Sequence, residues 1–352
     1  MTPLAERLMA QIAATGPITL ADYMALCLLD PAHGYYATRD PLGADGDFTT
    51  APEISQMFGE VIGLALAQAW IDQGRPSRFT LAELGPGRGT LMADLLRATA
   101  RVPGFLDAAE LHLVEASPVL RRAQTALLPN PAFHDTVETL PRAPLFCVAN
   151  EFFDALPIRQ FVKDGTGWRE RVVGLEAGAL AIGLTDPAPF SLLAHRADDT
   201  EDGQIVEISP ALPAITQTIA NRIAAHGGAA LIIDYGDWTS LGDTLQALRR
   251  HDRADPLAAP GEADLTAHVD FEAIARAAAP ACHTRLTPQG VFLERLGITD
   301  RANALARSLD GEALTAHIAA HRRLTHPSEM GDLFKVLGLY PNGAAPPPGL
   351  TA

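Results

Sequence analysis

Hydrophobic and polar positions divide the chain into a helical beginning and a longer part in which strands and helices alternate. Residues 4–14 are amphipathic, and a loop over residues 30–55 follows a second helical stretch. Apolar residues then recur at helical spacing from Ile54 to Ala69, so we expect a helix that ends near Gly74. Thr50 and Glu53 have the spacing of a capping box, which predicts where this helix begins.

From residue 78 the pattern changes to alternating strands and helices. The expected strands are residues 78–85, 110–117, 132–140 and 143–154, with helices at 90–100 and 118–127. Such alternation predicts a parallel sheet with helices on both faces, because parallel strands need crossover connections. The regularity breaks at residues 158–184, which predict a β-meander with turns at Asp164-Gly165 and Ala177-Gly178.

The remainder of the chain returns to the alternating pattern after one long insertion. We expect strands at residues 204–210, 229–236, 284–288 and 333–340, and helices at 211–225, 270–279 and 291–320. The predicted domains are an N-terminal helical lobe with a lid loop over 1–75 and an α/β domain over 76–340. That domain carries insertions at about 158–205 and 240–270, and a disordered tail follows over 341–352.

Composition narrows the class of protein and of partner. The net charge of −15 argues against a nucleic-acid ligand, since no basic stripe offsets it, and favours a basic partner such as an arginine-bearing protein segment. The cysteines, Cys27, Cys147 and Cys282, are far apart, which indicates a reducing compartment. No apolar run approaches the ~20 residues that span a bilayer, and the first residues do not form a secretory signal.

The stretch AELGPGRGTLMADLL, residues 82–96, places three alternating glycines between an expected strand and a helix. A phosphate-binding P-loop needs a lysine that this loop lacks, and a dinucleotide site needs G-x-G-x-x-G, one residue longer than the spacing of Gly85, Gly87 and Gly89. Glu83 would repel a pyrophosphate but could hold an ammonium group. S-adenosylmethionine has an ammonium and no phosphate, so it fits this loop better than NAD; a glycine turn that serves only helix–strand packing is the alternative.

Polar residues at the ends of two further strands extend the predicted site. Glu115 ends the second strand, where a carboxylate can accept both ribose hydroxyls; NAD sites share this feature, so it does not separate the two cofactors. Asn150, Glu151 and Asp154 follow the buried fourth strand, at the edge where open α/β sheets bind ligands. The simpler interpretation is that Asp154 caps the next turn and Asn150 holds the loop.

Longer segments resemble a known family over nearly the whole chain. They include DPAHGYY, GDFTTAPEISQMFGE, ELGPGRGTLMADLLR, VEASPVLRRAQ, ANEFFDALPIRQF, VEISP, DYG, GEADLTAHVDF, TPQGVFLERLGI and MGDLFKVLGLY, in that order. The chain resembles the MidA-like protein arginine methyltransferases, the group that contains the mitochondrial complex I assembly factor. The resemblance implies a Rossmann-like, seven-stranded class I methyltransferase sheet with an N-terminal helical lobe and an inserted β-meander.

The resemblance also implies S-adenosylmethionine as methyl donor, a protein arginine (by family, of a complex I subunit) as acceptor, and a bacterial cytoplasmic member. The predicted donor site comprises Glu83, Gly85, Gly87, Gly89, Thr90, Glu115, Ser117 and Asn150. The predicted catalytic residues are Glu151, Asp154 and Asn150, because carboxylates can orient a guanidinium by bidentate hydrogen bonds. The predicted substrate contacts are Tyr35, Tyr36, Asp47, Phe48, Glu53 and His268.

Methyl transfer from a sulfonium needs no metal, and the sequence contains no HExxH motif or Cys/His cluster with metal spacing. Two alternatives stay open from the residues alone. One is a methyltransferase that acts on a small molecule, and the other is an assembly factor that binds the donor without turnover.

Overall fold

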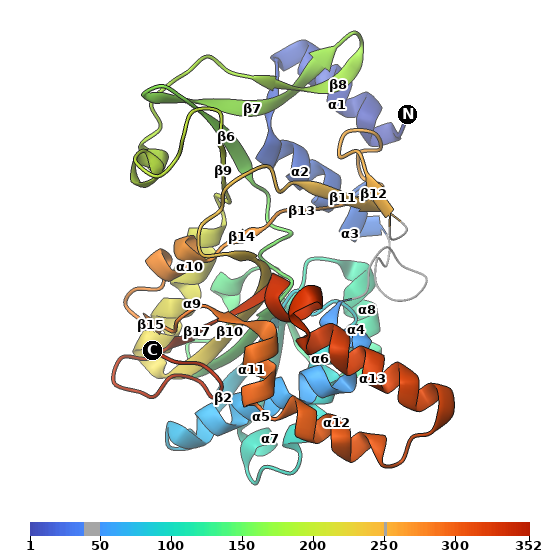
Figure 1. Cartoon of the computed structure of the whole chain (residues 1–352), viewed down its shortest axis with the longest axis vertical. Coiled ribbons are helices and arrows are strands. Elements are labelled where there is room, and N and C mark those ends of the chain that lie inside the picture. Colours follow the sequence, from blue (N-terminus) through green and yellow to red (C-terminus); the bar gives the residue numbers. More distant parts are fainter. Residues whose placement is uncertain (39–49, 250–251) are drawn as a thin grey trace. The chain divides into compact units, whose positions relative to one another are not determined.

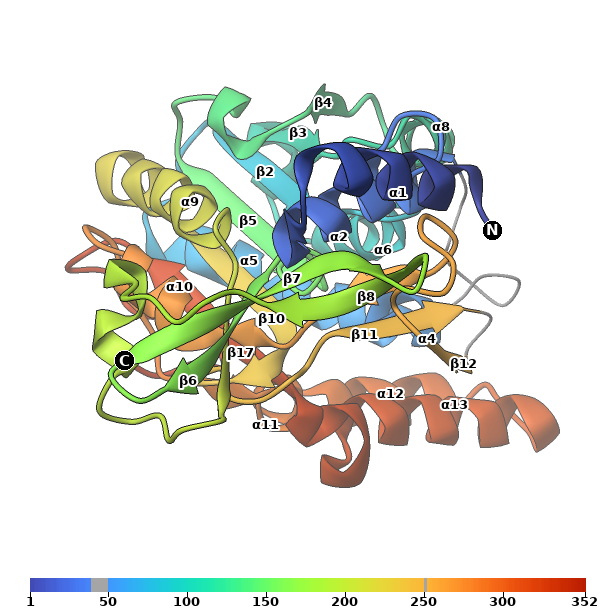
Figure 2. The same cartoon turned by 90° about the horizontal axis from the view of Figure 1, so that it is seen from above.

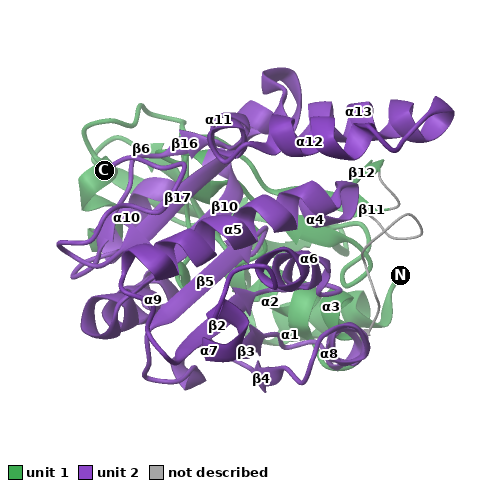
Figure 3. Ribbon diagram, turned by 90° about the horizontal axis from the view of Figure 1, so that it is seen from below, with its two compact units in different colours: residues 1–48, 154–212, 237–270 green, residues 49–153, 213–236, 271–352 purple. Residues whose placement is uncertain are grey.

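The computed structural model of the chain describes residues 1–38, 50–249 and 252–352. Clustering of contacts divides the chain into two compact units, each made of three separate stretches (Figure 3). Unit 1 comprises residues 1–48, 154–212 and 237–270, and unit 2 comprises residues 49–153, 213–236 and 271–352. This grouping differs from the predicted domains, because residues 49–75 belong with the main sheet and the predicted insertions group with the N-terminal residues.

The main sheet belongs to unit 2 and has the strand order β15-β17-β10-β5-β2-β3-β4 (Figure 1). Its strands are β2 (Phe79–Leu84), β3 (Ala109–Val114), β4 (Ala132–His134), β5 (Leu145–Asn150), β10 (Gly228–Asp237), β15 (Cys282–His283) and β17 (Phe334–Tyr340). All are parallel except β17, which is antiparallel to β10 and β15. Counted along the chain, the order is 3-2-1-4-5-7-6, so the main path of the sheet has the predicted seven strands, and two short strands pair beside it.

The central strands are buried on both faces, as expected for a parallel sheet covered by helices. Every residue of β2 and β5 is buried. The helices of unit 2 are α4 (Ala51–Ile54), α5 (Gln56–Asp72), α6 (Thr90–Thr99), α7 (Phe105–Ala108), α8 (Pro118–Leu127), α9 (Leu212–His226), α10 (Phe271–Ala277), α11 (Gln289–Arg295), α12 (Ile298–Ala306) and α13 (Gly311–Thr325). Figure 3 shows α5 crossing in front of β10 and β5. Its apolar residues share one core cluster with these strands and with α6.

Two glycines let α5 and α6 approach closely. A Cβ added at Gly59 would lie 2.8 Å from the Cβ of Asp94, and one at Gly63 would lie 2.7 Å from the Cγ of Leu95. Only residues without a side chain leave this room, so the spacing of four along α5 fits the helix to its neighbour. The close contact fixes the position of α6, which begins directly after the glycine loop.

The helix expected from residue 50 onward is two helices in the structure. α4 ends at Ile54, and Ser55 caps α5 by accepting a hydrogen bond from the Met57 N–H at 3.3 Å. Thr50 makes no side-chain cap, so the predicted capping box does not form. The Glu53 carboxylate has another partner, described below.

Unit 1 contains the N-terminal helices α1 (Pro3–Thr15), α2 (Leu20–Leu29) and α3 (Tyr35–Thr38) and an antiparallel sheet. The sheet has the order β1-β7-β6-β9, with β8 paired to β7; Figure 2 shows the long β7–β8 hairpin. Its strands are β1 (Ile18–Thr19), β6 (Arg159–Asp164), β7 (Gly167–Glu176), β8 (Ala179–Leu184) and β9 (Ile205–Ile208). The meander lies where the sequence predicted it, and Ala177 and Gly178 form the second turn with positive φ.

Short elements complete the two units. Unit 1 also contains the small sheet β12-β11-β13 (Asp252–Ala254, Gln246–Arg249, Asp264–Thr266), the strand β14 (Val269–Asp270) and the 3-10 helix η2 (Ser191–Arg196). Unit 2 contains η1 (Val137–Thr139), η3 (Pro327–Gly331) and β16 (Thr287–Pro288), which pairs with β17. Among the described residues, no helix is both long and apolar enough to cross a lipid bilayer.

The C-terminal residues differ from the expected disordered tail. Leu350 is buried in the core of unit 2, and the Thr351 carbonyl accepts a hydrogen bond from the Arg285 N–H at 2.8 Å. The Arg295 guanidinium donates to the Gly349 carbonyl at 3.1 Å. The prolines and glycines of this segment suggest disorder by composition, but a single apolar residue near the end anchors it.

Candidate functional site

The glycine loop lies at the point of the main sheet where the strand order reverses. It follows β2, which pairs with β3 on one side and with β5 on the other. In open α/β sheets, ligands bind at such a reversal, outside the carboxyl ends of the strands. Glu83 near the end of β2, Glu115 just after β3 and Asn150 at the end of β5 therefore lie at one edge of unit 2, as predicted.

The backbone of the loop requires glycine. Gly85, Gly87 and Gly89 have φ of +61°, +55° and +87°, a region that residues with a side chain rarely adopt. The Gly89 N–H donates to the Pro86 carbonyl at 2.7 Å, which closes a tight turn just before α6. The turn presents bare main chain and the first N–H groups of α6 at the edge of the sheet.

Two acceptor oxygens at this edge have no partner within the described protein. Glu83 is 3% exposed; the Met92 N–H donates to its carboxylate, but its Oε2 has no hydrogen bond. Asn150 donates through Nδ2 to Glu151, while its buried Oδ1 has none. Burial, and then the charge of Glu115, raise the pKa of Glu83 well above its usual value. A buried acceptor without a partner loses its hydrogen bonds to water, so a ligand that donates hydrogen bonds to both oxygens would be stabilised here.

Glu115 is held in one orientation by two neighbours. Its Oε1 accepts from the Ser117 N–H at 2.7 Å, and its Oε2 accepts from Gln124 Nε2 at 3.3 Å. Burial raises its pKa, and these hydrogen bonds act in the opposite direction. Each carboxylate oxygen can accept a second hydrogen bond, so Glu115 can still bind a pair of hydroxyls. The Ser117 side chain itself caps α8 by accepting from the Leu120 N–H at 3.3 Å.

These residues fit S-adenosylmethionine, which supplies an electrophilic methyl group on a sulfonium when bound. Glu83 and Asn150 offer acceptors for its ammonium, and Glu115 offers acceptors for its ribose hydroxyls. The glycines with positive φ leave the backbone free of side chains where S-adenosylmethionine would lie. Gln124 was missed by the sequence reasoning; the only signal was one polar residue within the apolar stripe of Leu120 and Leu128.

Two hydrogen bonds attach the short helix α4 to the start of α6 and to the loop after β5. Thr90, the first residue of α6, donates through Oγ1 to Glu53 Oε1 at 2.5 Å. The Ala51 N–H, at the start of α4, donates to Glu151 Oε1 at 3.1 Å. The predicted residues Glu53, Thr90 and Glu151 thus lie around α4, and Glu53 contacts the residue that follows the glycine loop.

The loop after β5 is held in an uncommon conformation. Glu151 has a φ of +52°, and its N–H donates to the Ile233 carbonyl at 2.9 Å. Asp234, at 0% exposure, accepts from the Phe153 N–H at 3.0 Å. A positive φ at a non-glycine residue persists only where its surroundings impose it, and such residues concentrate at functional sites. Asp234 begins the DYG segment noted in the sequence, but its hydrogen bond to the loop after β5 was not predicted.

The remaining predicted residues belong to unit 1 or lie outside the described residues. Tyr35 is buried in the core of unit 1. The Tyr36 hydroxyl donates to Asp264 Oδ1 at 2.8 Å, and burial, then the charges of Asp264 and Asp154, raise the pKa of Tyr36. The His268 N–H donates to Thr244 Oγ1 at 2.8 Å. Asp47 and Phe48 lie outside the described residues.

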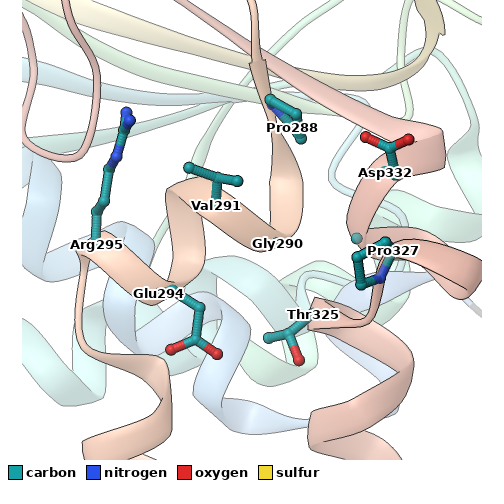
Figure 4. A pocket seen from close by; sticks show the side chains of 9 residues that line it. Pro288, Gly290, Val291, Glu294, Arg295, Thr325, Pro327 and Asp332 are labelled. Atoms are coloured by element: carbon teal, nitrogen blue, oxygen red, sulfur yellow. The ribbon is translucent and has the colours of Figure 1, made fainter.

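A separate hollow of about 520 Å³ lies in unit 2 between α11 and the turn after α13 (Figure 4). Its lining residues include Pro288, Val291, Glu294, Thr325 and Asp332, none of which is a predicted site residue. The Glu294 carboxylate already accepts hydrogen bonds from the Thr299 hydroxyl at 2.8 Å. In the described part of the chain, no three His, Cys, Asp or Glu side chains gather as a metal site.

The raised pKa of Glu83 predicts that donor binding depends on pH. A carboxyl whose pKa is raised on folding stabilises the empty protein below its unfolded pKa, about 4.3, and this stabilisation is lost as pH rises through the folded pKa. An ammonium ligand needs the carboxylate, so its binding strengthens over the same rise in pH. We therefore expect the increase in Tm caused by a fixed concentration of S-adenosylhomocysteine to grow from about pH 5 to pH 8.

Thermal melts with and without S-adenosylhomocysteine measure this increase, and Glu83→Gln is the matched control because glutamine does not titrate. The variant should show a smaller increase that changes less with pH, since Glu115, whose pKa is also raised, still titrates. A wild-type increase that stays constant over the range would contradict the assignment of Glu83 to the ammonium.

Sequence comparison relates the chain to curated relatives and to one family model. Residues 61–289 match the model of the family described as "Putative S-adenosyl-L-methionine-dependent methyltransferase". The protein arginine methyltransferase NDUFAF7, mitochondrial, of Xenopus laevis is 36% identical over 96% of this chain and 84% of its own. The protein of the same name from Danio rerio is 37% identical over 94% of this chain and 85% of its own. The human protein is 36% identical over 97% of this chain and 84% of its own.

Structural comparison gives the same fold over nearly the whole chain. A crystal structure of a superfamily member from Burkholderia thailandensis, bound to S-adenosyl-homocysteine, has a TM-score of 0.81 and 32% identity, and covers 96% of this chain and 91% of the other. A native crystal structure of a protein from the same organism has a TM-score of 0.78 at the same identity and coverage.

The prediction of a bacterial cytoplasmic protein was wrong, since the curated relatives at 36–37% identity are mitochondrial proteins. That prediction rested on the family resemblance and on the dispersed cysteines. Dispersed cysteines indicate a reducing environment, which more than one compartment provides.

Proposed function

Because this chain belongs to the family of S-adenosyl-L-methionine-dependent methyltransferases whose model it matches, we propose that it transfers a methyl group to an arginine side chain of a protein. The curated relatives are named protein arginine methyltransferases, and the alignment with them covers nearly the whole of this chain. The observation that supports the proposal is that Glu83, Glu115 and Asn150 lie beside the glycine loop at the carboxyl ends of neighbouring strands of unit 2. The net charge of −15 supports a basic target.

Glu151 is the proposed catalytic carboxylate of unit 2. A guanidinium is a poor nucleophile because its pKa lies above about 12. A carboxylate that accepts two of its N–H groups orients the planar group and raises the electron density on the reacting nitrogen. The hydrogen bonds from Ala51 and from Asn150 Nδ2, both at 3.1 Å, hold Glu151 Oε1 in place for this task. Asn150 thereby supports Glu151 as well as offering Oδ1 to the donor.

The roles predicted for Asp154, Tyr35, Tyr36 and His268, which belong to unit 1, stay predictions, as do those of Asp47 and Phe48. Glu53 contacts Thr90 and lies within unit 2. We propose that Glu53 contacts the substrate and, through Thr90, also restrains the start of α6 beside the glycine loop. The family resemblance extends the proposal to a subunit of respiratory complex I as the target.

Transfer of a labelled methyl group tests the proposed function. The protein is incubated with methyl-labelled S-adenosylmethionine and an extract of cells. These cells lack the protein, so the target in the extract is unmethylated. We expect label in one protein, on an arginine located by mass spectrometry of its peptides, and identification of that protein tests the complex I assignment. Label in small molecules would favour the small-molecule alternative, and donor binding without any transfer would favour the non-catalytic one.

A further inference from the structure

Gln124 is a fully buried polar residue of α8. Leu120 lies four residues before it on the helix, and Leu128, the residue that follows the helix, lies four residues after it; Leu120, Gln124 and Leu128 are 4%, 0% and 4% exposed. A leucine at position 124 would pack beside these residues without polar atoms. A fully buried glutamine is unusual there, because its amide loses its hydrogen bonds to water.

The amide of Gln124 joins two parts of the donor site. Its Nε2 donates to the Gly87 carbonyl at 2.6 Å and to Glu115 Oε2 at 3.3 Å. Both partners can only accept, so the orientation of the amide is fixed and Oε1 points away from them. This Oε1 is fully buried and has no hydrogen-bond partner among the described residues. Packing alone does not account for an amide whose hydrogen bonds both go to the donor site.

Each contact restrains a group that the donor needs. The hydrogen bond to the Gly87 carbonyl holds the middle of the glycine loop, where φ is +55°. The hydrogen bond to Oε2 is the second of two that fix the Glu115 carboxylate, the other being from the Ser117 N–H. Together they set the separation between the loop and the acid across the donor site.

We propose that Gln124 is a positioning residue for the methyl donor: it holds the glycine loop and the Glu115 carboxylate at the spacing that the adenosyl nucleoside requires. The inference rests on the proposed function, since it takes Glu115 as the acceptor of the ribose hydroxyls. It assigns to α8 a part in donor recognition that neither the glycine motif nor the acid after β3 contains.

A ligand pair separates this role from a structural one. S-adenosylhomocysteine and its 2′,3′-dideoxy analogue differ only in the hydroxyls that Glu115 would bind, so the ratio of their Kd values reports the Glu115 contact. We expect a ratio of about 30 or more in the wild-type protein, as for hydrogen bonds to a charged group. In Gln124→Leu the carboxylate loses its second restraint, and the ratio should fall below about 5. A packing defect would weaken both ligands equally and leave the ratio unchanged.

Gln289 provides the matched control. It is 0% exposed, its Nε2 donates to the Leu324 carbonyl at 2.9 Å, and its Oε1 also has no partner among the described residues. Gln289→Leu therefore removes a similar buried amide from α11 and should keep the wild-type ratio. Gln124→Met, which preserves the length of the side chain, is measured beside Gln124→Leu, so that a misfolded leucine variant does not decide the test.

Calorimetry of both ligands with all four proteins gives the outcome. A wild-type ratio in a folded Gln124 variant would overturn the inference. Equal affinities of the wild-type protein for both ligands would refute the role of Glu115 and the inference with it, while methyl transfer to a protein arginine would still stand or fall by the labelling experiment.

Discussion

Replacing Gly87 with valine is expected to weaken the binding of S-adenosylhomocysteine about 100-fold or more, which corresponds to about 2.7 kcal/mol. Gly87 has a φ of +55° in the turn closed by the Gly89 N–H and the Pro86 carbonyl. A β-branched residue is strained in this region, at a cost of about 1–3 kcal/mol, so the loop would change its path. The valine methyl groups would also occupy the space beside the main chain where the nucleoside approaches. Calorimetric titration measures the change.

Gly297→Val is the control for the backbone effect alone. Gly297 precedes α12 in the same unit, has a φ of +85°, and a Cβ added there would meet no atom within 4 Å. The substitution should lower the Tm by a similar amount and leave the affinity for S-adenosylhomocysteine unchanged. A Gly87→Val protein that binds as tightly as the wild type would exclude the glycine loop as the donor site.

The features that could be predicted from the sequence are those that depend on the residues of one element or one turn. Buried strands alternating with amphipathic helices predict the parallel sheet, and glycines at alternate positions predict a backbone that needs positive φ. Glu83 was predicted from its place two residues before the first glycine of the loop, and Glu115 and Asn150 because each is a polar residue at the end of an expected strand. Parallel strands bring their carboxyl ends to one edge, so these three residues meet there without any knowledge of their contacts.

The contacts between distant segments could not be predicted. Glu53 binds Thr90 at a separation of 37 residues, and Glu151 binds the Ala51 N–H at a separation of 100. Within its own segment, Glu53 completes the spacing of a capping box, and only the three-dimensional packing of α4 beside α6 gives it a different partner. Gln124 is hidden for the same reason, since its partners Gly87 and Glu115 lie in other elements.

The division of the chain into two units could not be predicted from the sequence either. Each unit is assembled from three stretches of chain, so a boundary drawn along the sequence cannot reproduce it. α5 was assigned to the N-terminal lobe because it precedes the first long strand. Its glycines and apolar residues pack on α6 and the main sheet, which places it in unit 2.

Glu151→Gln should reduce methyl transfer roughly 100-fold or more while the Kd for S-adenosylhomocysteine changes by less than about threefold. Glutamine retains one acceptor oxygen, so the Ala51 N–H at the start of α4 keeps its partner. It loses the negative charge and the second acceptor, and so cannot hold the two N–H groups of a guanidinium. Steady-state kinetics with the labelled donor and calorimetry with S-adenosylhomocysteine measure the two quantities separately.

Glu151→Gly distinguishes catalysis from support of α4. Glycine accepts the φ of +52° without strain but removes both the carboxylate and the hydrogen bond to Ala51. If Glu151 acts on the substrate, both variants lose turnover. If it only caps α4, the glutamine variant keeps its turnover and the glycine variant alone loses it, because glutamine still accepts the Ala51 N–H. Wild-type turnover of Glu151→Gln would therefore assign Glu151 to the support of α4 and leave the catalytic carboxylate to be sought elsewhere.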